Sequence, residues 1–401
     1  MTNGDFLENI TYEISKIGRS NGFDYPNLAN INPFKNFFNG EFLNHNELDT
    51  LDGSYTRREL LTRYLILNAV LDQGPDVKGV RILLEKVTNT LYRRGITIFH
   101  DPIKFFSNMG LVLKIINKQH EIVKRIRSSE WALKNNSDPN RYNLFFAQSQ
   151  RGIVSNQLLD YVIHRWGVPL SVPILLEDHP KFINSDEPLV KLLESSPSSE
   201  KMSENIKKDV NFSNFGLGSA IGNKACHLFA KWYIYNFNLC KNNDKSWSKW
   251  SYELPIDSNA GRVLFRSGFL LEMADLEYYN QKNVIINRKG KNKKKYLRVT
   301  NIRDIKVQSI LNEHINKNYI EVAKNHLKIN KQTPRSYKIQ IIPNAILYNS
   351  EFGIGEFDDG LLYIGTNYCF NHSKPNCNQC PISHLCKGKN KNKELIKEYS
   401  T

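Results

Sequence analysis

Apolar residues recur at helical spacing over much of the chain, and this pattern predicts a mainly α-helical protein. Over residues 57–70 the apolar positions lie three or four residues apart, which predicts a helix. Residues 73–76, Gln-Gly-Pro-Asp, end this helix, and a second helix is expected over 77–91. Further helices are predicted over 103–127, 157–166, 189–193 and 228–239. Strands are expected to be few.

Other regions lack this periodicity. Residues 1–50 are rich in Asn, Phe and Gly, and a loosely structured lead-in is expected there. Polar stretches near 135–142 and 195–205 contain Pro and Ser and predict loops or linkers. Residues 288–295 carry a run of Lys and Arg, followed by alternating residues at 296–300. We interpret the run as a turn or solvated loop joining two strands, or alternatively as an insertion that contacts phosphates.

The charge balance indicates a class of partner. The 401-residue chain has 55 Lys and Arg against 40 Asp and Glu, a net charge of +15. Such an excess attracts a polyanion, because phosphates release their counterions on binding. Alternatively, the basic charge only keeps the protein in solution. The length suggests about two or three domains.

The sequence gives no sign of a membrane or secretory protein. No apolar run is long enough to span a membrane, so no membrane association is expected. The N-terminus lacks the basic-then-apolar plan of a secretory signal. We therefore expect an intracellular location, cytoplasmic or nuclear, where thiols stay reduced.

A group of cysteines near the C-terminus carries the strongest chemical signal. Four of the six cysteines follow the pattern C-x7-C-x2-C-x5-C: Cys369, Cys377, Cys380 and Cys386. Converging thiolates repel one another unless a metal neutralises them, so an iron–sulfur cluster, zinc and disulfides are the alternatives. A structural zinc site usually pairs two short C-x2-C steps, and this chain has only one, so the spacing favours a [4Fe-4S] cluster. Cys226 and Cys240 are expected to be ordinary buried or half-buried thiols.

Residues 219–226 place a glycine and a lysine at the start of an apolar helix. Gly222 predicts a tight turn between two helices, where backbone N–H groups around Gly222 and Asn223 would face a phosphate. Lys224 would lie in the first helical turn, where the helix dipole and partial burial favour a neutral, nucleophilic amine. The alternative is an ordinary surface lysine in a helix–turn–helix connection.

A carboxylate marks the start of a later helix. Residues 254–263 open this helix, with Asp257 just before its apolar positions. The simplest interpretation of Asp257 is a helix N-cap. A catalytic role is compatible with capping, because a carboxylate fixed at a helix start has the rigidity that catalysis requires.

Three motifs in this order resemble the helix-hairpin-helix DNA glycosylases of the endonuclease III type. They are Gly-x-Lys, Ile-Asp-Ser-Asn-x-x-Arg-Val and the four-cysteine loop. Lys224 falls on the family's catalytic lysine, Asp257 on its catalytic aspartate, and Arg262 on the Arg of its Arg-Val pair. Residues 361–369 are similar to the family's Leu-x-x-x-Gly-x-x-x-Cys helix. Gln73 resembles a glutamine that helps to fill the gap left by an extruded base.

The chain also departs from the family pattern. Ala220 replaces the first hairpin glycine, and the first cysteine gap is one residue longer than in the family. Lys224 and Asp257 are 33 residues apart, so residues 239–251 are expected to form an extra excursion. Residues 271–338 form a large insertion that carries the basic run.

The resemblance implies two helical lobes flanking a DNA-binding cleft, with a helix-hairpin-helix motif and a [4Fe-4S] loop. The boundaries that we expect are 1–56 for the lead-in, 57–255 for a helical domain with the helix-hairpin-helix near 206–240, 256–368 for the second lobe, 369–386 for the cluster loop and 387–401 for a basic tail.

The resemblance also implies the chemistry of a DNA glycosylase with AP lyase activity in base excision repair. A monomer would bind double-stranded DNA and flip out a damaged or mismatched base. Lys224 would attack the sugar C1′ and form a Schiff base that permits strand cleavage, and Asp257 would stabilise the cationic sugar. Phosphates would be contacted at Gly222, Asn223, Arg262, Lys374, Lys387 and Lys389.

Other functions stay open on the sequence alone. One is a non-catalytic iron–sulfur protein that binds DNA, and another is a module that binds structural zinc. A third is a sequence-specific restriction-type glycosylase or nuclease, whose insertion supplies recognition. Among substrates, an oxidised pyrimidine is the first expectation, followed by an oxidised purine or a mismatched pyrimidine.

Overall fold

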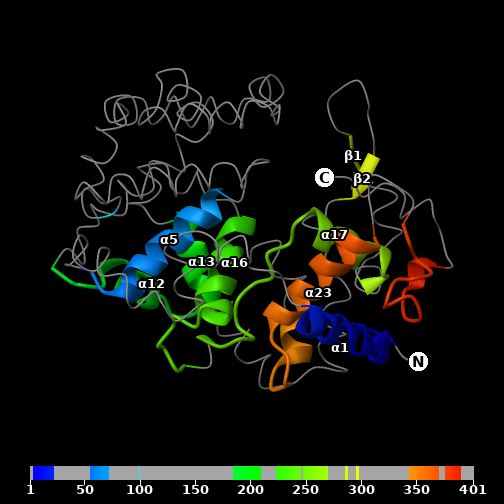
Figure 1. The fold of residues 1–401 in the computed structure, drawn as a ribbon, viewed down its shortest axis with the longest axis horizontal. Helices are drawn as coiled ribbons and strands as arrows, with labels where there is room; N and C mark the ends of the chain where they lie inside the picture. The colour runs from blue at the N-terminus through cyan, green and yellow to red at the C-terminus, as the bar shows by residue number, and fades with distance from the viewer. Residues whose placement is uncertain are drawn as a thin grey trace, which may run out of the picture.

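The computed structural model describes residues 3–21, 55–71, 99, 184–208, 223–244, 247–269, 285–287, 295–297, 343–369 and 375–389. Most of these residues are helical, which confirms that the protein is mainly α-helical (Figure 1). The helices predicted over 77–91, 103–127 and 157–166, and the loop near 135–142, lie outside the described residues. None of the helices in the described ranges has the length and apolar character needed to cross a bilayer.

One group of helices surrounds the segment that carries Lys224. α5 (Arg57–Leu71) and α13 (Ser199–Lys208) pack on α16 (Asn223–Lys231), and α12 (Pro188–Glu194) packs on α5 (Figure 1). α16 continues as a short π-helix, η3 (Trp232–Asn236). The core of the group contains Leu60, Leu65, Leu189, Met202, Phe229 and Ala230. The helices predicted over 57–70 and 189–193 are confirmed, whereas the one predicted over 228–239 begins and ends a few residues earlier.

Residues 199–205 of the polar stretch 195–205 are helical, so the loop prediction is wrong for them, whereas residues 195–198 do form a turn. α12 ends at Glu194 and α13 begins at Ser199, which leaves only a short turn between them. The backbone N–H of Lys201 donates a hydrogen bond to Ser198 Oγ at 3.1 Å. Because serine favours helix N-caps as well as loops, its presence did not distinguish the two structures.

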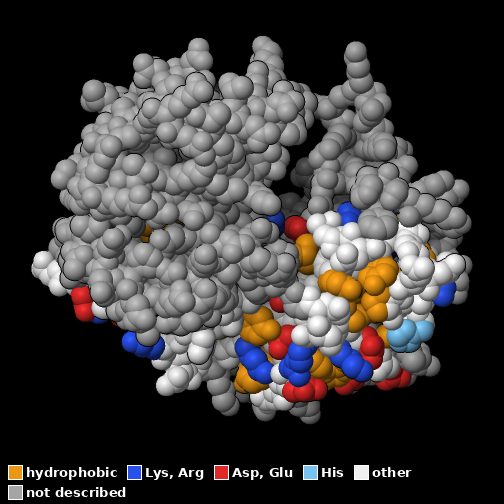
Figure 2. Space-filling view, viewed as in Figure 1, with side chains coloured by type: hydrophobic (Ala, Val, Ile, Leu, Met, Phe, Trp, Pro, Cys, Tyr) orange, Lys and Arg blue, Asp and Glu red, His pale blue; other side chains and the backbone are white. Residues whose placement is uncertain are grey.

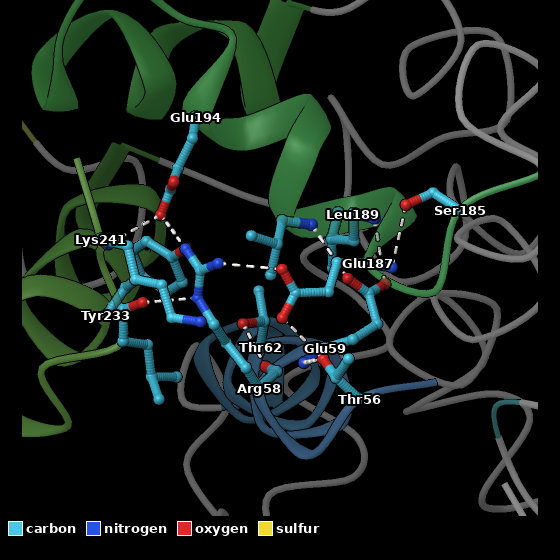
Figure 3. A network of polar contacts seen from close by, with 12 residues as sticks. Thr56, Arg58, Glu59, Thr62, Ser185, Glu187, Leu189, Glu194, Tyr233 and Lys241 are labelled. Carbon is cyan, nitrogen blue, oxygen red and sulfur yellow. Dashed lines mark hydrogen bonds and ion pairs between the residues drawn. The ribbon is translucent and has the colours of Figure 1, made fainter. Parts of the chain in front are cut away.

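Arg58 joins this group through a polar network at the start of α5 (Figure 3). Its Nη1 donates to Glu187 Oε2 at 3.0 Å, its Nη2 donates to Glu194, and its Nε donates to the Leu239 carbonyl at 2.7 Å. The Tyr233 hydroxyl donates to the same Glu194 oxygen at 2.7 Å. The Arg58 side chain is 12% exposed. One guanidinium therefore holds α5 against α12, against Tyr233 of η3 and against the segment that follows η3, in a largely dry site.

A second group consists of α1 (Asn3–Asn21), α17 (Ser258–Arg266) and α23 (Ile354–Asn367). α1 lies along α23, and α17 packs on α23 (Figure 1). α1 corrects the expectation of a loosely structured lead-in. Its buried apolar side chains recur at helical spacing: Phe6, Leu7, Ile10, Ile14 and Ile17. The helix covers only 19 residues of the stretch 1–50, in which no sustained periodicity was expected.

Two glycines bring α1 and α23 into backbone contact. A Cβ on Gly18 would lie 1.8 Å from the Glu356 carbonyl oxygen, and a Cβ on Gly360 would lie 1.9 Å from the Ile14 carbonyl oxygen. Neither position has room for any side chain. The close approach therefore requires glycine on both helices.

The basic run follows one short strand and leads into another, as predicted. β1 (Ile285–Asn287) and β2 (Lys295–Leu297) pair antiparallel, with Ile285 opposite Leu297. Residues 288–294 and most of the insertion 271–338 lie outside the described residues.

Candidate active site

Lys224 lies in the first turn of α16, and its side chain is half-buried. His227 and Lys231 follow three and seven residues later, so the three side chains share one face of the helix. α16 begins at Asn223, and Gly222 and the preceding turn lie outside the described residues. The helix-hairpin-helix motif therefore stays a prediction, as does the cleft.

The shared face of α16 meets the segment that leads to Asp257. His227 Nε2 lies 2.7 Å from Glu253 Oε2, and His227 Nδ1 lies 3.3 Å from the Leu254 carbonyl oxygen. His227 and Glu253 are both buried. One turn after Lys224, α16 is therefore held against residues that closely precede Asp257.

Asp257 caps α17, which confirms the simpler interpretation of this residue. Its Oδ1 accepts hydrogen bonds from the backbone N–H groups of Asn259 and Ala260, each at 2.8 Å. Both bonds end on the same oxygen, so capping does not use Oδ2. The carboxylate is half-buried and fixed at the helix start. Capping thus provides the rigidity that a catalytic role would need.

A buried ion cluster joins α16 to α23. Lys231 Nζ lies 2.6 Å from Asp358 Oδ2 and 2.5 Å from Asp359 Oδ1. We call these three residues the buried triad, because each is 6% exposed or less. Burial raises the pKa of Asp358 to about 6; Lys231 opposes the rise, and Asp359 and Asp257 add to it.

Asparagine at position 358 is expected to stabilise the fold at neutral and higher pH. The pKa of Asp358 in the folded protein exceeds the ordinary value of 3.8, so the folded state binds the proton more tightly than the unfolded state. The free energy of unfolding is therefore higher at low pH and falls as the pH rises through about 6. Asp358→Asn should therefore raise the free energy of unfolding by on the order of 1 kcal/mol at about pH 8 and by much less at about pH 4. Thermal unfolding at the two pH values measures this difference. An equal gain at both would contradict it.

Arg262 lies buried on α17 and joins that helix to α23. Its Nη2 donates to the Gly365 carbonyl and to Asn259 Oδ1, each at 2.7 Å, and its Nε donates to the Cys369 carbonyl. The residue is 4% exposed. These bonds give Arg262 a structural role. Its predicted contact with DNA stays a prediction.

The other end of α17 reaches the cysteine loop. Arg266 Nη1 donates to Cys369 Sγ, and Cys386 Sγ donates to the Arg266 carbonyl oxygen, each at 3.6 Å. α17 is nine residues long. One short helix thus connects the Asp257 cap with two of the four clustered cysteines.

The four thiols are close enough to affect one another. Burial raises the pKa of Cys380 to about 11, and Cys386, Cys369 and Cys377 add to the rise. As a donor set, four cysteines of one loop fit a thiolate-bound cluster. Within the ranges that the structure describes, however, no three His, Cys, Asp or Glu side chains are arranged to hold a metal ion. The [4Fe-4S] cluster therefore stays a prediction.

The basic residues next to the cysteine loop differ in their surroundings. The stem of Lys387 packs against Gly268, and its Nζ lies 4.0 Å from the centre of the Phe6 ring. Lys389 is exposed, so its position suits a phosphate contact better than that of Lys387. Two further residues predicted to contact DNA, Lys374 and Gln73, lie outside the described residues.

The face of the molecule seen in Figure 2 shows no single patch of positive charge among the described residues. On the face seen in Figure 2, Lys and Arg side chains of the described residues alternate with Asp and Glu. The densest basic segment of the sequence, 288–294, is not among these residues.

Sequence reasoning missed the residues that hold the candidate site together: His227, Lys231, Asp358 and Asp359. A signal was present, because Lys231 interrupts an apolar helix and the two aspartates lie in another. A charge on a buried face needs a partner. The pattern could not identify that partner across more than 120 residues. In contrast, Cys226 is buried and Cys240 half-buried, as predicted.

No family profile matches the chain, and no curated protein or solved structure is similar to it at a significant level. Its function is therefore inferred from the residues and their geometry.

Proposed function

We propose that the chain is a DNA glycosylase with AP lyase activity of the helix-hairpin-helix type, acting in base excision repair. One observation carries the proposal: the face of α16 that bears Lys224 also bears His227 and Lys231, which contact the segment before Asp257 and the helix on which α17 packs. An amine and a carboxylate thus come from elements that the protein fixes together.

In the proposed reaction, Lys224 Nζ forms a bond to C1′ of a flipped nucleotide as the N-glycosidic bond breaks. The base leaves with the bonding electron pair and takes up a proton. The bonded nitrogen gives up one proton, and we assign Asp257 as its acceptor. The C1′–O4′ bond then breaks, O4′ takes up a proton, and the sugar ring opens to a protonated Schiff base. Loss of a C2′ proton then expels the 3′ phosphate, which cuts the strand. Water hydrolyses the Schiff base and regenerates the amine.

Asp257 would act on the positive charge of the sugar. A carboxylate held in place before the reaction stabilises a developing oxocarbenium ion without having to reorganise. Because capping uses Oδ1, Oδ2 is the oxygen that we assign to the reaction.

The [4Fe-4S] cluster would be held by Cys369, Cys377, Cys380 and Cys386. Its binding energy would order the loop that carries Lys374 and Lys389, as metals do in other short polar segments. We assign it no step in the reaction. The bound DNA would lie between the two helix groups, with phosphates near Asn223 and the loop and Gln73 entering the duplex.

Incision of defined duplexes tests the proposal. The protein should cut a duplex at a single abasic site, leaving a β-elimination product, and it should cut one or more duplexes in a panel that carries oxidised pyrimidines, oxidised purines or mismatches. The cut should not require added divalent metal, because the proposed chemistry uses none. Binding to these duplexes without incision would support a non-catalytic DNA-binding protein instead.

The cluster makes a separate prediction. Protein purified without oxygen should be yellow-brown, contain iron and sulfide, and absorb blue light. Cys380→Ser should remove most of the iron, because one of four thiolate ligands is lost. Cys240→Ser, outside the loop, is the matched control and should keep the iron. Colourless protein that contains zinc would contradict the iron–sulfur assignment.

A sequence-specific restriction-type glycosylase is the second candidate, and the hairpin formed by β1 and β2 favours it. A two-stranded ribbon fits the major groove of DNA, and the basic run lies between the two strands in the sequence. Cutting of undamaged DNA at one defined sequence would favour this reading over repair.

A further inference from the structure

We infer that Lys231 is a positioning residue, whose buried ammonium fixes α16 on α23 so that Lys224 faces Asp257. The inference rests on the proposed function, because that function makes Lys224 the nucleophile. Lys231 itself lies two helical turns from Lys224, about 10 Å along the axis, and takes no part in the chemistry.

The contacts of Lys231 suit it to orientation more than to stability. Its Nζ reaches two neighbouring carboxylates of α23, those of Asp358 and Asp359, at 2.6 and 2.5 Å. The Lys231 side chain is 3% exposed. In such a site the loss of hydration offsets much of the attraction between the charges, so the net gain in stability is small. The charges do, however, disfavour any arrangement of the two helices in which they fail to meet.

The type of helix changes directly after Lys231. α16 gives way to the π-helix η3 at Trp232, and such insertions redirect the residues that follow. Tyr235 of η3 packs so closely on Gly355 of α23 that a Cβ there would lie 2.2 Å from the ring. α16 and η3 therefore meet α23 at two successive points. Lys231 is the one nearer to Lys224.

Because Lys224 lies two helical turns from Lys231, a small change in the tilt of α16 would displace the Lys224 amine. A tilt of about 10° about Lys231 would move the start of α16 by about 2 Å. A misplacement of about 1 Å at a reacting centre can lower the rate by about 100-fold. His227 supports the same placement halfway along, through Glu253 and the Leu254 carbonyl.

Three variants of increasing severity test the inference. Asp359→Asn keeps the shape of one partner and removes its charge. Lys231→Met removes the ammonium. Lys231→Met/Asp358→Leu/Asp359→Leu replaces the whole triad by apolar side chains, an exchange that often preserves stability. Lys191→Met, at an exposed lysine on α12, is the matched control.

Two measurements are made on each folded variant. With a saturating duplex that contains one abasic site, the rate of borohydride-trapped adduct formation should fall by about 100-fold in the two Lys231 variants and by less in Asp359→Asn, while the Kd for the duplex changes by less than about 3-fold. Hydrogen exchange should be faster at the amides of 223–231 and 253–257 and unchanged along α1. The control should match the wild type in both.

The outcomes separate the inference from the proposed function. If the wild type forms the adduct and a folded triad variant forms it at the same rate, the positioning role is wrong and the function stands. If the wild type forms no adduct, the function is wrong. Unchanged hydrogen exchange in the triad variants would then also overturn the claim that Lys231 orients α16.

Discussion

Replacement of Arg58 by alanine is expected to lower the free energy of unfolding by about 2 to 4 kcal/mol. The guanidinium is the shared partner of Glu187 and Glu194, whose side chains are only 16% and 18% exposed. Its loss leaves two partly buried carboxylates close together without a counter-charge, and it frees the Leu239 carbonyl that Arg58 Nε now binds. The midpoint of urea unfolding measures the change.

Arg19 provides the matched comparison for Arg58. It pairs with Glu351 at 2.7 Å and with the largely buried Glu356 at 3.3 Å, but its own side chain is 42% exposed, against 12% for Arg58. Solvent screens such a pair, so Arg19→Ala should cost about 1 kcal/mol or less. If the two variants lost equal stability, the network in Figure 3 would not be the structural centre that its burial indicates.

The second large effect is expected at Asp257, where two roles can be separated. Asparagine caps helices nearly as well as aspartate, so Asp257→Asn should keep the stability within about 0.5 kcal/mol. It removes the charge that would stabilise the cationic sugar, so the rate of base excision should fall by about 100-fold or more. Single-turnover excision and thermal unfolding on the same preparation measure both.

Asp257→Ala completes the comparison. It loses the cap as well as the charge and should cost about 1 kcal/mol of stability in addition to the activity. An Asp257→Asn protein with wild-type excision would leave Asp257 as a cap only. The carboxylate would then have no part in the reaction.

The local features of the fold could be predicted from the sequence where one periodic segment contains its own start signal. α17 is such a case, because aspartate is a common N-cap residue and Asp257 does cap this helix. α5 was predicted because its apolar positions recur over four turns. α1 was not predicted, although its buried apolar positions recur as regularly, because it occupies only part of a longer stretch rich in Asn, Phe and Gly.

The arrangement of the site could be predicted only in part. The sequence singled out Lys224 and Asp257 but not the contacts that relate them, which run through His227 and Lys231. Those contacts depend on which helix packs on which, and Lys231 meets Asp358 from 127 residues away. A charged residue at a buried position indicates that a partner exists, but the sequence does not identify which residue it is. Likewise, the burial of Arg262 follows from the packing of α17 on α23 and could not be predicted from the sequence.

Covalent capture of DNA shows whether Lys224 is the nucleophile. Borohydride is added to the protein with a duplex that contains one abasic site, and the adduct is located by peptide mass spectrometry. We expect an adduct on Lys224 in the wild type and in Lys191→Ala, and none in Lys224→Ala. An adduct of undiminished yield in Lys224→Ala, or no adduct in a folded wild type that binds the duplex, would contradict this expectation.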